Sequence, residues 1–273
     1  MVIKKILNRK PITLVVHIQT SGIQKIGIRI EDIIKPYSIY IDRVQTIRGK
    51  GKFYLRIPQS PQVAKITIYD KNRRGDNSFK AVFEEVPLKR KFTVNQITNP
   101  VTREFVKFAQ WFSDKAGILD SNQTIYIADS GKFRIDYVND IRDRKTGRIL
   151  ETPARINKGT GIIEIARNKF KTYTIPMRMA ILLHEFSHFY LNRVMEDETE
   201  ADMNALLIYL GLGYSRVEAI KVFLRVFYKT PSDGNVQRYK VIENMINNFE
   251  KTKMRLIGNR KSYNRNYYYD GEV

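Results

Sequence analysis

Residues 177–193 read MRMAILLHEFSHFYLNR, and they form the longest apolar helix candidate in the chain. Breaks at 211–213 and 231–234, which contain glycine or proline, separate the helical segments that follow. The sequence is therefore predicted to be helical from Pro176 onward. The later segments are TEADMNALLIYLGLG (199–213), SRVEAIKVFLRVFYK (215–229) and NVQRYKVIENMINNFEK (235–251).

The pattern changes ahead of this stretch. Residues 101–117 place aromatic residues at helical spacing after an Asn99-Pro100 start, which predicts an amphipathic helix. TIYIAD (124–129), KFRIDYV (132–138) and GIIEIA (161–166) are typical of strands, whereas the charged segment 139–160 is typical of a loop. Residues 99–250 are therefore predicted to form one domain, with a small mixed sheet and C-terminal helices.

The first 90 residues are rich in β-branched and aromatic residues. Turn sequences such as Ser21-Gly22 and 48–51 divide them into short strands, which predicts a small β-sandwich over residues 1–90 and an α+β protein overall. Residues 91–98 are predicted to be a linker and 251–273 a basic, tyrosine-rich tail. The six expected strands are ITLVVHIQT (12–20), KIGIRI (25–30), YSIYI (37–41), KFYLRI (52–57), AKITIY (64–69) and SFKAVFEEV (78–86).

Positive charge is concentrated at the two ends of the chain. The total is +20, and residues 1–98 carry 20 basic and 7 acidic side chains, a net +13. The segment 251–273 carries 6 and 2, a net +4. We therefore expect these two regions to meet an acidic partner or DNA.

Cysteine is absent, which excludes disulfides, thiolate metal sites and cysteine nucleophiles. No apolar run approaches the roughly 18 residues that a membrane span requires, and no secretory signal is expected. We accordingly expect a cytoplasmic or virion location.

Two of the three histidines, His184 and His188, stand four residues apart in HEFSH. This spacing places both imidazoles on one face of a helix, where they can share a metal ion. Glu185 lies about 100° round the same helix and can reach a water on that metal. The pattern therefore predicts a Zn²⁺ site whose water is deprotonated by Glu185.

A catalytic zinc site usually has three protein ligands. The third histidine, His17, lies in the strand-rich region, so the remaining ligand is expected to be a carboxylate. Five acidic residues follow the histidines, and these are Glu196, Asp197, Glu198, Glu200 and Asp202. Acidic residues are also favoured in the first turn of any helix. Asp202 can in addition accept a hydrogen bond from a ligating imidazole.

HEFSH resembles the motif of the zincin metallopeptidases, and ETEAD resembles the second motif of their gluzincin branch. The resemblance implies His184, His188 and Glu198 as zinc ligands, Glu185 as general base and Asp202 as the residue that orients an imidazole. Only nine residues separate His188 from Glu198, fewer than is usual in gluzincins, so Glu200 stays a rival ligand.

The zincin resemblance also implies hydrolysis of a peptide or protein substrate that lies along an edge strand, and residues 161–166 are the candidate strand. The oxyanion stabiliser is not identified, and three nearby tyrosines are possibilities: Tyr190, Tyr209 and Tyr214.

The overall character of the chain is similar, more loosely, to connector or tail-ring proteins of crAss-like tailed bacteriophages. That similarity implies a second function, in which the chain is a structural virion protein with a zincin-like domain of weak or no activity. Its partners are then expected to be further copies of itself or other virion proteins. In this reading, residues 1–98 and 251–273 dock on acidic neighbours or DNA.

Overall fold

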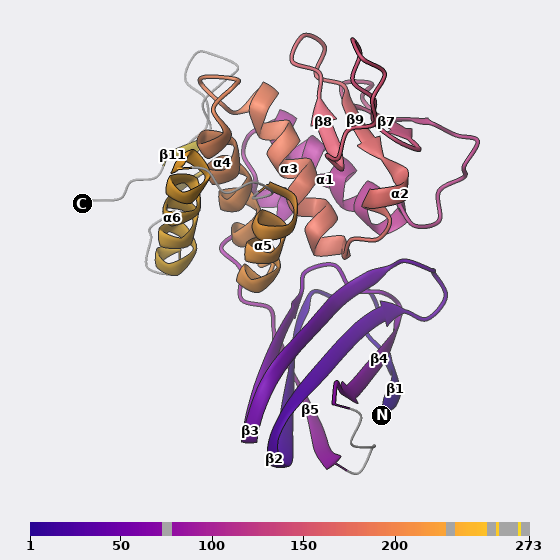
Figure 1. The fold of residues 1–273 in the computed structure, drawn as a ribbon, viewed down its shortest axis with the longest axis vertical. Helices are drawn as coiled ribbons and strands as arrows, with labels where there is room; N and C mark the ends of the chain where they lie inside the picture. Colours follow the sequence, from indigo (N-terminus) through magenta and orange to yellow (C-terminus); the bar gives the residue numbers. More distant parts are fainter. Residues whose placement is uncertain (73–77, 228–232, 250–254, 257–266, 269–273) are drawn as a thin grey trace.

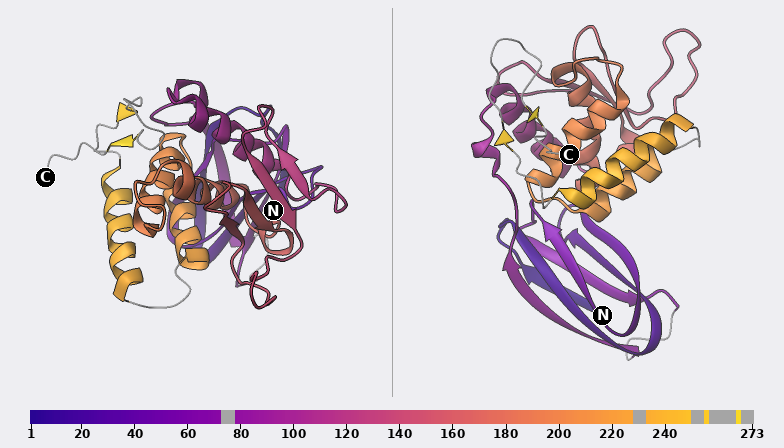
Figure 2. Two further views of the ribbon diagram at one scale, coloured as in Figure 1. Left: turned by 90° about the horizontal axis from the view of Figure 1, so that it is seen from above. Right: turned by 90° about the vertical axis from the view of Figure 1, so that its left-hand side faces the viewer.

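The computed structural model describes residues 1–72, 78–227, 233–249, 255–256 and 267–268. A curved antiparallel sheet from the first 87 residues lies against a second body of helices around a four-stranded mixed sheet (Figures 1 and 2). The predicted α+β class is confirmed. None of the helices within the described ranges combines the length and apolar character that a membrane crossing requires. Most of the predicted tail lies outside the described residues, apart from β10 (Arg255–Leu256) and β11 (Tyr267–Tyr268).

The N-terminal sheet is organised around two long strands. β2 pairs with β3 along most of its length, while its other edge pairs with β5 over residues 12–20 and with β4 over residues 26–32. β1 pairs with β4 and completes the five strands. Inward side chains from both halves of β2 belong to one apolar core, among them Leu14, Val16, Ile28 and Ile30. The strands are β1 (Val2–Ile6), β2 (Ile12–Asp32), β3 (Ile39–Ile57), β4 (Val63–Asp70) and β5 (Phe79–Pro87).

The turns expected at Ser21-Gly22 and at 48–51 are wrong, because β2 and β3 run straight through them. The pairing register shifts between Gln19 and Ile23, and Gly49 takes a positive φ of 70° at this point. Glycine adopts that conformation without strain, so the irregularity becomes a bulge rather than a chain reversal. Four of the six expected strands therefore merge into two.

The second body contains the chemistry-bearing residues. Its sheet has the order β6-β7-β9-β8, with β7 and β9 parallel and the other pairs antiparallel. Helix α3 packs against β8 and against α1 (Figure 1), and Phe112 of α1 contacts Tyr137 of β7. Its elements are α1 (Pro100–Lys115), β6 (Ile125–Ile127), β7 (Arg134–Val138), β8 (Ala154–Ile156), β9 (Ile163–Ala166), α2 (Arg167–Phe170), α3 (Ile175–Tyr190), α4 (Glu198–Gly211), α5 (Arg216–Val222) with a π-helical continuation (Phe223–Phe227), and α6 (Asp233–Asn248).

The expectation that residues 161–166 form an edge strand is wrong. β9 lies between β7 and β8, and the edge next to α3 is β8. β8 has only three residues and falls in the segment 139–160 that was predicted to be a loop. A strand this short carries too little alternation to be recognised, and it is defined by its antiparallel pairing with β9.

The predicted linker packs against the second body. Phe92 and Ile97 are buried, and Gly211 O accepts hydrogen bonds from the backbone N–H groups of Lys91 (2.9 Å) and Phe92 (3.2 Å). A short 3₁₀ turn, η2 (Val94–Gln96), lies within it.

Arg178 on α3 joins the two bodies. Its fully buried guanidinium donates to four backbone carbonyls, of Tyr37 (2.5 Å), Ser113 (2.8 Å), Phe170 (3.2 Å) and Lys171 (2.7 Å). Burial lowers the pKa of this guanidinium to about 10.

Arg178→Met is expected to lower the free energy of unfolding by about 3 kcal/mol or more, because several buried carbonyls lose their donor together. Chemical denaturation of the metal-free protein measures this loss. Arg144→Met is the control, since the Arg144 side chain is 65% exposed, and it should change stability by less than about 0.5 kcal/mol. Equal denaturation midpoints for the two variants would contradict the role of Arg178 in joining the two bodies.

Candidate metal centre

Helix α3 presents His184 and His188 on one face, one turn apart. The helix begins at a Thr174 cap whose side chain accepts from Met177 N, and Pro176 occupies its first turn. Both imidazoles are only 4% exposed, and their Nε2 atoms lie 3.1 Å apart. The four-residue spacing therefore brings the two Nε2 atoms together at one side of the helix.

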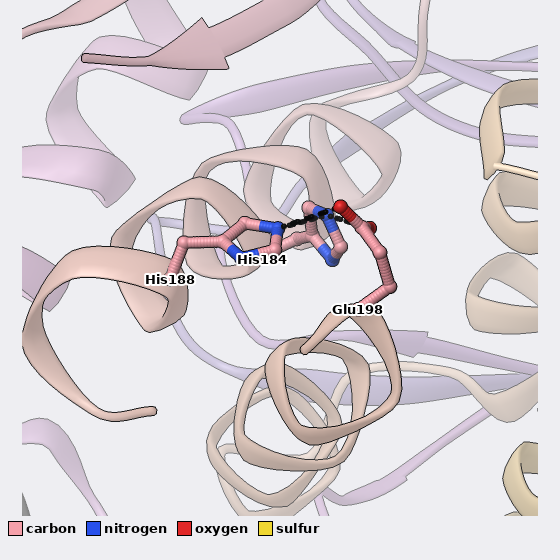
Figure 3. A group of neighbouring side chains, drawn as sticks. All are labelled: His184, His188 and Glu198. Carbon is pink, nitrogen blue, oxygen red and sulfur yellow. Dashed lines mark hydrogen bonds and ion pairs between the residues drawn. The ribbon is translucent and has the colours of Figure 1, made fainter. Parts of the chain in front are cut away.

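Helix α4 supplies the third group. Its first residue is Glu198, whose carboxylate points toward the two histidines (Figure 3). Oε2 lies 3.4 Å from His184 Nε2, and Oε1 lies 3.4 Å from His188 Nε2. Within the described residues, His184, His188 and Glu198 form the cluster that could hold a metal ion.

The short connection between α3 and α4 is held by asparagines. Asn192 Nδ2 donates to Asp197 O (2.7 Å), and Asn204 Nδ2 donates to Asn192 Oδ1 (3.1 Å). Asp197 then caps α4 by accepting from Glu200 N at 2.9 Å. This compact turn explains how nine intervening residues suffice to bring Glu198 to the histidines. The two asparagines have no sequence signal of their own and were missed.

The partners of the two Nδ1 atoms determine which imidazole nitrogens are protonated. His188 Nδ1 lies 2.7 Å from the carbonyl oxygen of Met195, which can only accept. His184 Nδ1 lies 2.8 Å from the Asp202 carboxylate. In the neutral rings, both Nδ1 atoms therefore carry the hydrogen, by assignment from these partners. Both Nε2 atoms then face the Glu198 carboxylate and each other, and either a metal ion or a proton placed between them relieves the repulsion of their lone pairs.

The distances among the three side chains are close to the ligand spacing around a tetrahedral ion. Ligands about 2.0–2.1 Å from a tetrahedral Zn²⁺ lie about 3.3–3.4 Å from one another. The two Nε2 atoms lie 3.1 Å apart, and each lies 3.4 Å from a different oxygen of the Glu198 carboxylate, Oε2 for His184 and Oε1 for His188. The residues present therefore match the donor set and the size of a His₂-carboxylate metal site.

The same geometry shifts the pKa values of these groups. Burial lowers the pKa of His184, but the hydrogen bond and charge of Asp202, with help from Glu198, raise it overall to about 10. Burial raises the pKa of Glu198, but hydrogen bonds from His184 and His188 hold it well below its usual range. The neighbouring carboxylates thus stabilise positive charge at His184.

Glu185 lies beside the centre and is buried. Ile156 N, on the edge strand β8, donates to its Oε2 at 2.8 Å. Burial raises the pKa of Glu185, and the two histidines and this backbone donor partly oppose the shift. A carboxylate with a raised pKa next to a metal site is suited to take up and release a proton.

The rival ligand Glu200 lies outside this cluster. Its carboxylate accepts from Arg193 Nε (2.8 Å) and from Arg193 N (2.9 Å), and so fastens the loop that precedes α4. Glu196 is exposed and lies 3.5 Å from Lys158.

The three tyrosines considered as oxyanion stabilisers each make a different contact. Tyr214 OH donates to Gln59 Oε1 (2.5 Å) at the contact with the N-terminal sheet, and Tyr190 stacks on Phe186. Tyr209 is fully buried, against a cavity of about 20 Å³ that His184 and Asp202 also line.

Arg238 is another site residue that the sequence reasoning missed. It lies on α6 and is 9% exposed, and it contacts both Asp202 and Glu198. One signal was available: Arg238 shares a helical face with the buried Ile242 and Met245, where an apolar residue is expected.

A second hollow lies on the N-terminal sheet. A groove of about 430 Å³ is lined by Lys50, Lys52 and Lys80, and by His17, whose Nε2 lies 3.2 Å from Glu84 Oε2. Contact of this region with an acidic partner or DNA stays a prediction.

Comparisons with protein-family models, curated proteins and solved structures return no match for this chain.

Proposed function

We propose that this protein is a zinc-dependent metallopeptidase that hydrolyses peptide bonds with an activated water. The observation that carries the proposal is the convergence of the two Nε2 atoms, 3.1 Å apart, with the Glu198 carboxylate, whose two oxygens each lie 3.4 Å from one of them. A buried carboxylate one residue from the first imidazole supports it.

The donor set favours zinc among the divalent ions. Two imidazoles and one carboxylate with an open fourth position are the ligand class of catalytic zinc sites. A bound Zn²⁺ supplies Lewis acidity, which lowers the pKa of a coordinated water to about 7 and polarises a carbonyl.

Residues of the protein itself transfer the protons and hold the substrate. Glu185 takes the proton of the attacking water and returns it to the amine nitrogen as the peptide bond breaks. The Ile156 N–H holds Oε2 of Glu185 at 2.8 Å and so fixes the direction of the carboxylate. An extended substrate would pair with backbone groups on the outer edge of β8 other than Ile156 N, which Glu185 holds, and Ala154 O, which accepts from Thr152 Oγ1.

Metal content tests the first step of this proposal. The protein is expected to carry one Zn²⁺ per chain by native mass spectrometry. The ion should raise the free energy of unfolding by about 2.7 kcal/mol at a free concentration 100 times its dissociation constant. A chelator should therefore lower the thermal midpoint, and added Zn²⁺ should restore it. A midpoint indifferent to chelator, with no metal in the spectrum, would reject the metal site.

A further inference from the structure

Helix α6 inserts one buried cation beside the metal centre. Arg238 Nε donates to Asp202 Oδ2, and Arg238 Nη2 lies 3.2 Å from Glu198 Oε2. Its guanidinium also lies 5.5 Å from the centroid of the Phe223 ring. The planar group therefore has a fixed place between two carboxylates of α4.

Both carboxylates also contact the histidines of the candidate metal centre. Asp202 uses its other oxygen, Oδ1, to hold His184 Nδ1, so the two Asp202 oxygens link Arg238 to the imidazole in one chain of contacts. The Glu198 side chain is 51% exposed, so packing alone does not order it. Arg238 adds a buried cation to the contacts that Glu198 makes with the two histidines.

We propose that Arg238 is a positioning residue of the metal centre, which fixes Glu198 and Asp202 together and thereby makes metal binding depend on helix α6. The inference rests on the proposed metal function. The role belongs to arginine, because its planar fork can serve two carboxylates at once, whereas a lysine ammonium acts as a point charge.

Positioning and charge predict opposite effects on affinity. A cation near the centre repels a divalent ion, so simple removal of the charge would tighten metal binding. Loss of positioning would weaken it, and partners that orient metal ligands typically change affinity about 10- to 100-fold. The sign of the change therefore separates the two roles.

The experiment measures Zn²⁺ affinity of the full chain by competition with a chromophoric chelator, well below the unfolding temperature. The variants are Arg238→Met, Arg238→Lys and the control Lys240→Met. Lys240 is exposed on the same helix, so its substitution removes one positive charge at a distance from the ligands. The visible absorption of bound Co²⁺ reports the coordination geometry in each variant.

Arg238→Met is expected to bind Zn²⁺ about 10- to 100-fold more weakly and to change the Co²⁺ spectrum. Arg238→Lys should recover only part of the affinity and Lys240→Met should match the parent. If Arg238→Met does not fold, the Zn²⁺ affinity of Arg238→Lys tests the proposal, and binding weaker than that of the parent supports the positioning role. Parent-like or tighter binding in the folded variants overturns the positioning role while leaving the metal site intact. Absence of metal binding by the parent overturns the proposed function itself.

Discussion

Glu185→Gln is expected to lower kcat for peptide hydrolysis by about 10²- to 10⁴-fold, the usual contribution of a general base. The amide has nearly the shape of the carboxylate and can still accept the Ile156 N–H, so the edge strand should keep its place. It cannot take a proton from water. The metal content should stay at the parent level, because Glu185 lies outside the cluster that could hold the ion.

A broad peptide library, with and without chelator, provides the activity measurement. Glu196→Gln is the matched control, because Glu196 is 71% exposed in the loop before α4. It should cleave like the parent. Undiminished turnover by Glu185→Gln would remove Glu185 from the mechanism. A parent that binds metal yet cleaves nothing in the library would favour the structural-protein alternative, with the domain as a scaffold.

Glu198→Ala is expected to weaken Zn²⁺ binding by more than about 100-fold, because losing a ligand costs more than losing a group that orients one. Glu200→Ala is the comparison, two residues away with the same change in charge. Glu200 binds the Arg193 backbone and side chain, so its loss should reduce thermal stability and leave metal affinity within a few-fold of the parent.

Chelator competition gives both affinities, and a thermal scan of the metal-free proteins checks the stability. If Glu200→Ala weakened Zn²⁺ binding more than Glu198→Ala did, Glu200 would be the ligand in the metal-bound protein. Equal weakening in both variants would mean that the start of α4 acts as a unit, and that neither carboxylate alone is the ligand.

The sequence allowed prediction of the features that rest on local geometry. A spacing of four residues puts two side chains on one helical face whatever packs around them, so His184 and His188 could be paired from HEFSH alone. The change from strand-like to helical patterning likewise predicted the α+β class. Acidic residues after the helix limited the third ligand to a short set.

Features that depend on how turns and neighbouring elements pack against one another could not be predicted in this way. Glu198 and Glu200 are two residues apart and equally acidic, and only the turn held by Asn192 directs one of them to the histidines. β8 is a strand because β9 lies beside it, and β2 is continuous because a glycine bulge absorbs its irregularity.

The sequence by itself determined that two imidazoles share a helical face and that carboxylates follow them, since helical periodicity is a property of the local chain. Only the tertiary structure decided which carboxylate meets the imidazoles, which backbone amide holds Glu185, and that Arg238 of α6 reaches the same point. Those choices depend on how separate helices, strands and turns pack against one another, and no spacing along the sequence encodes that packing directly.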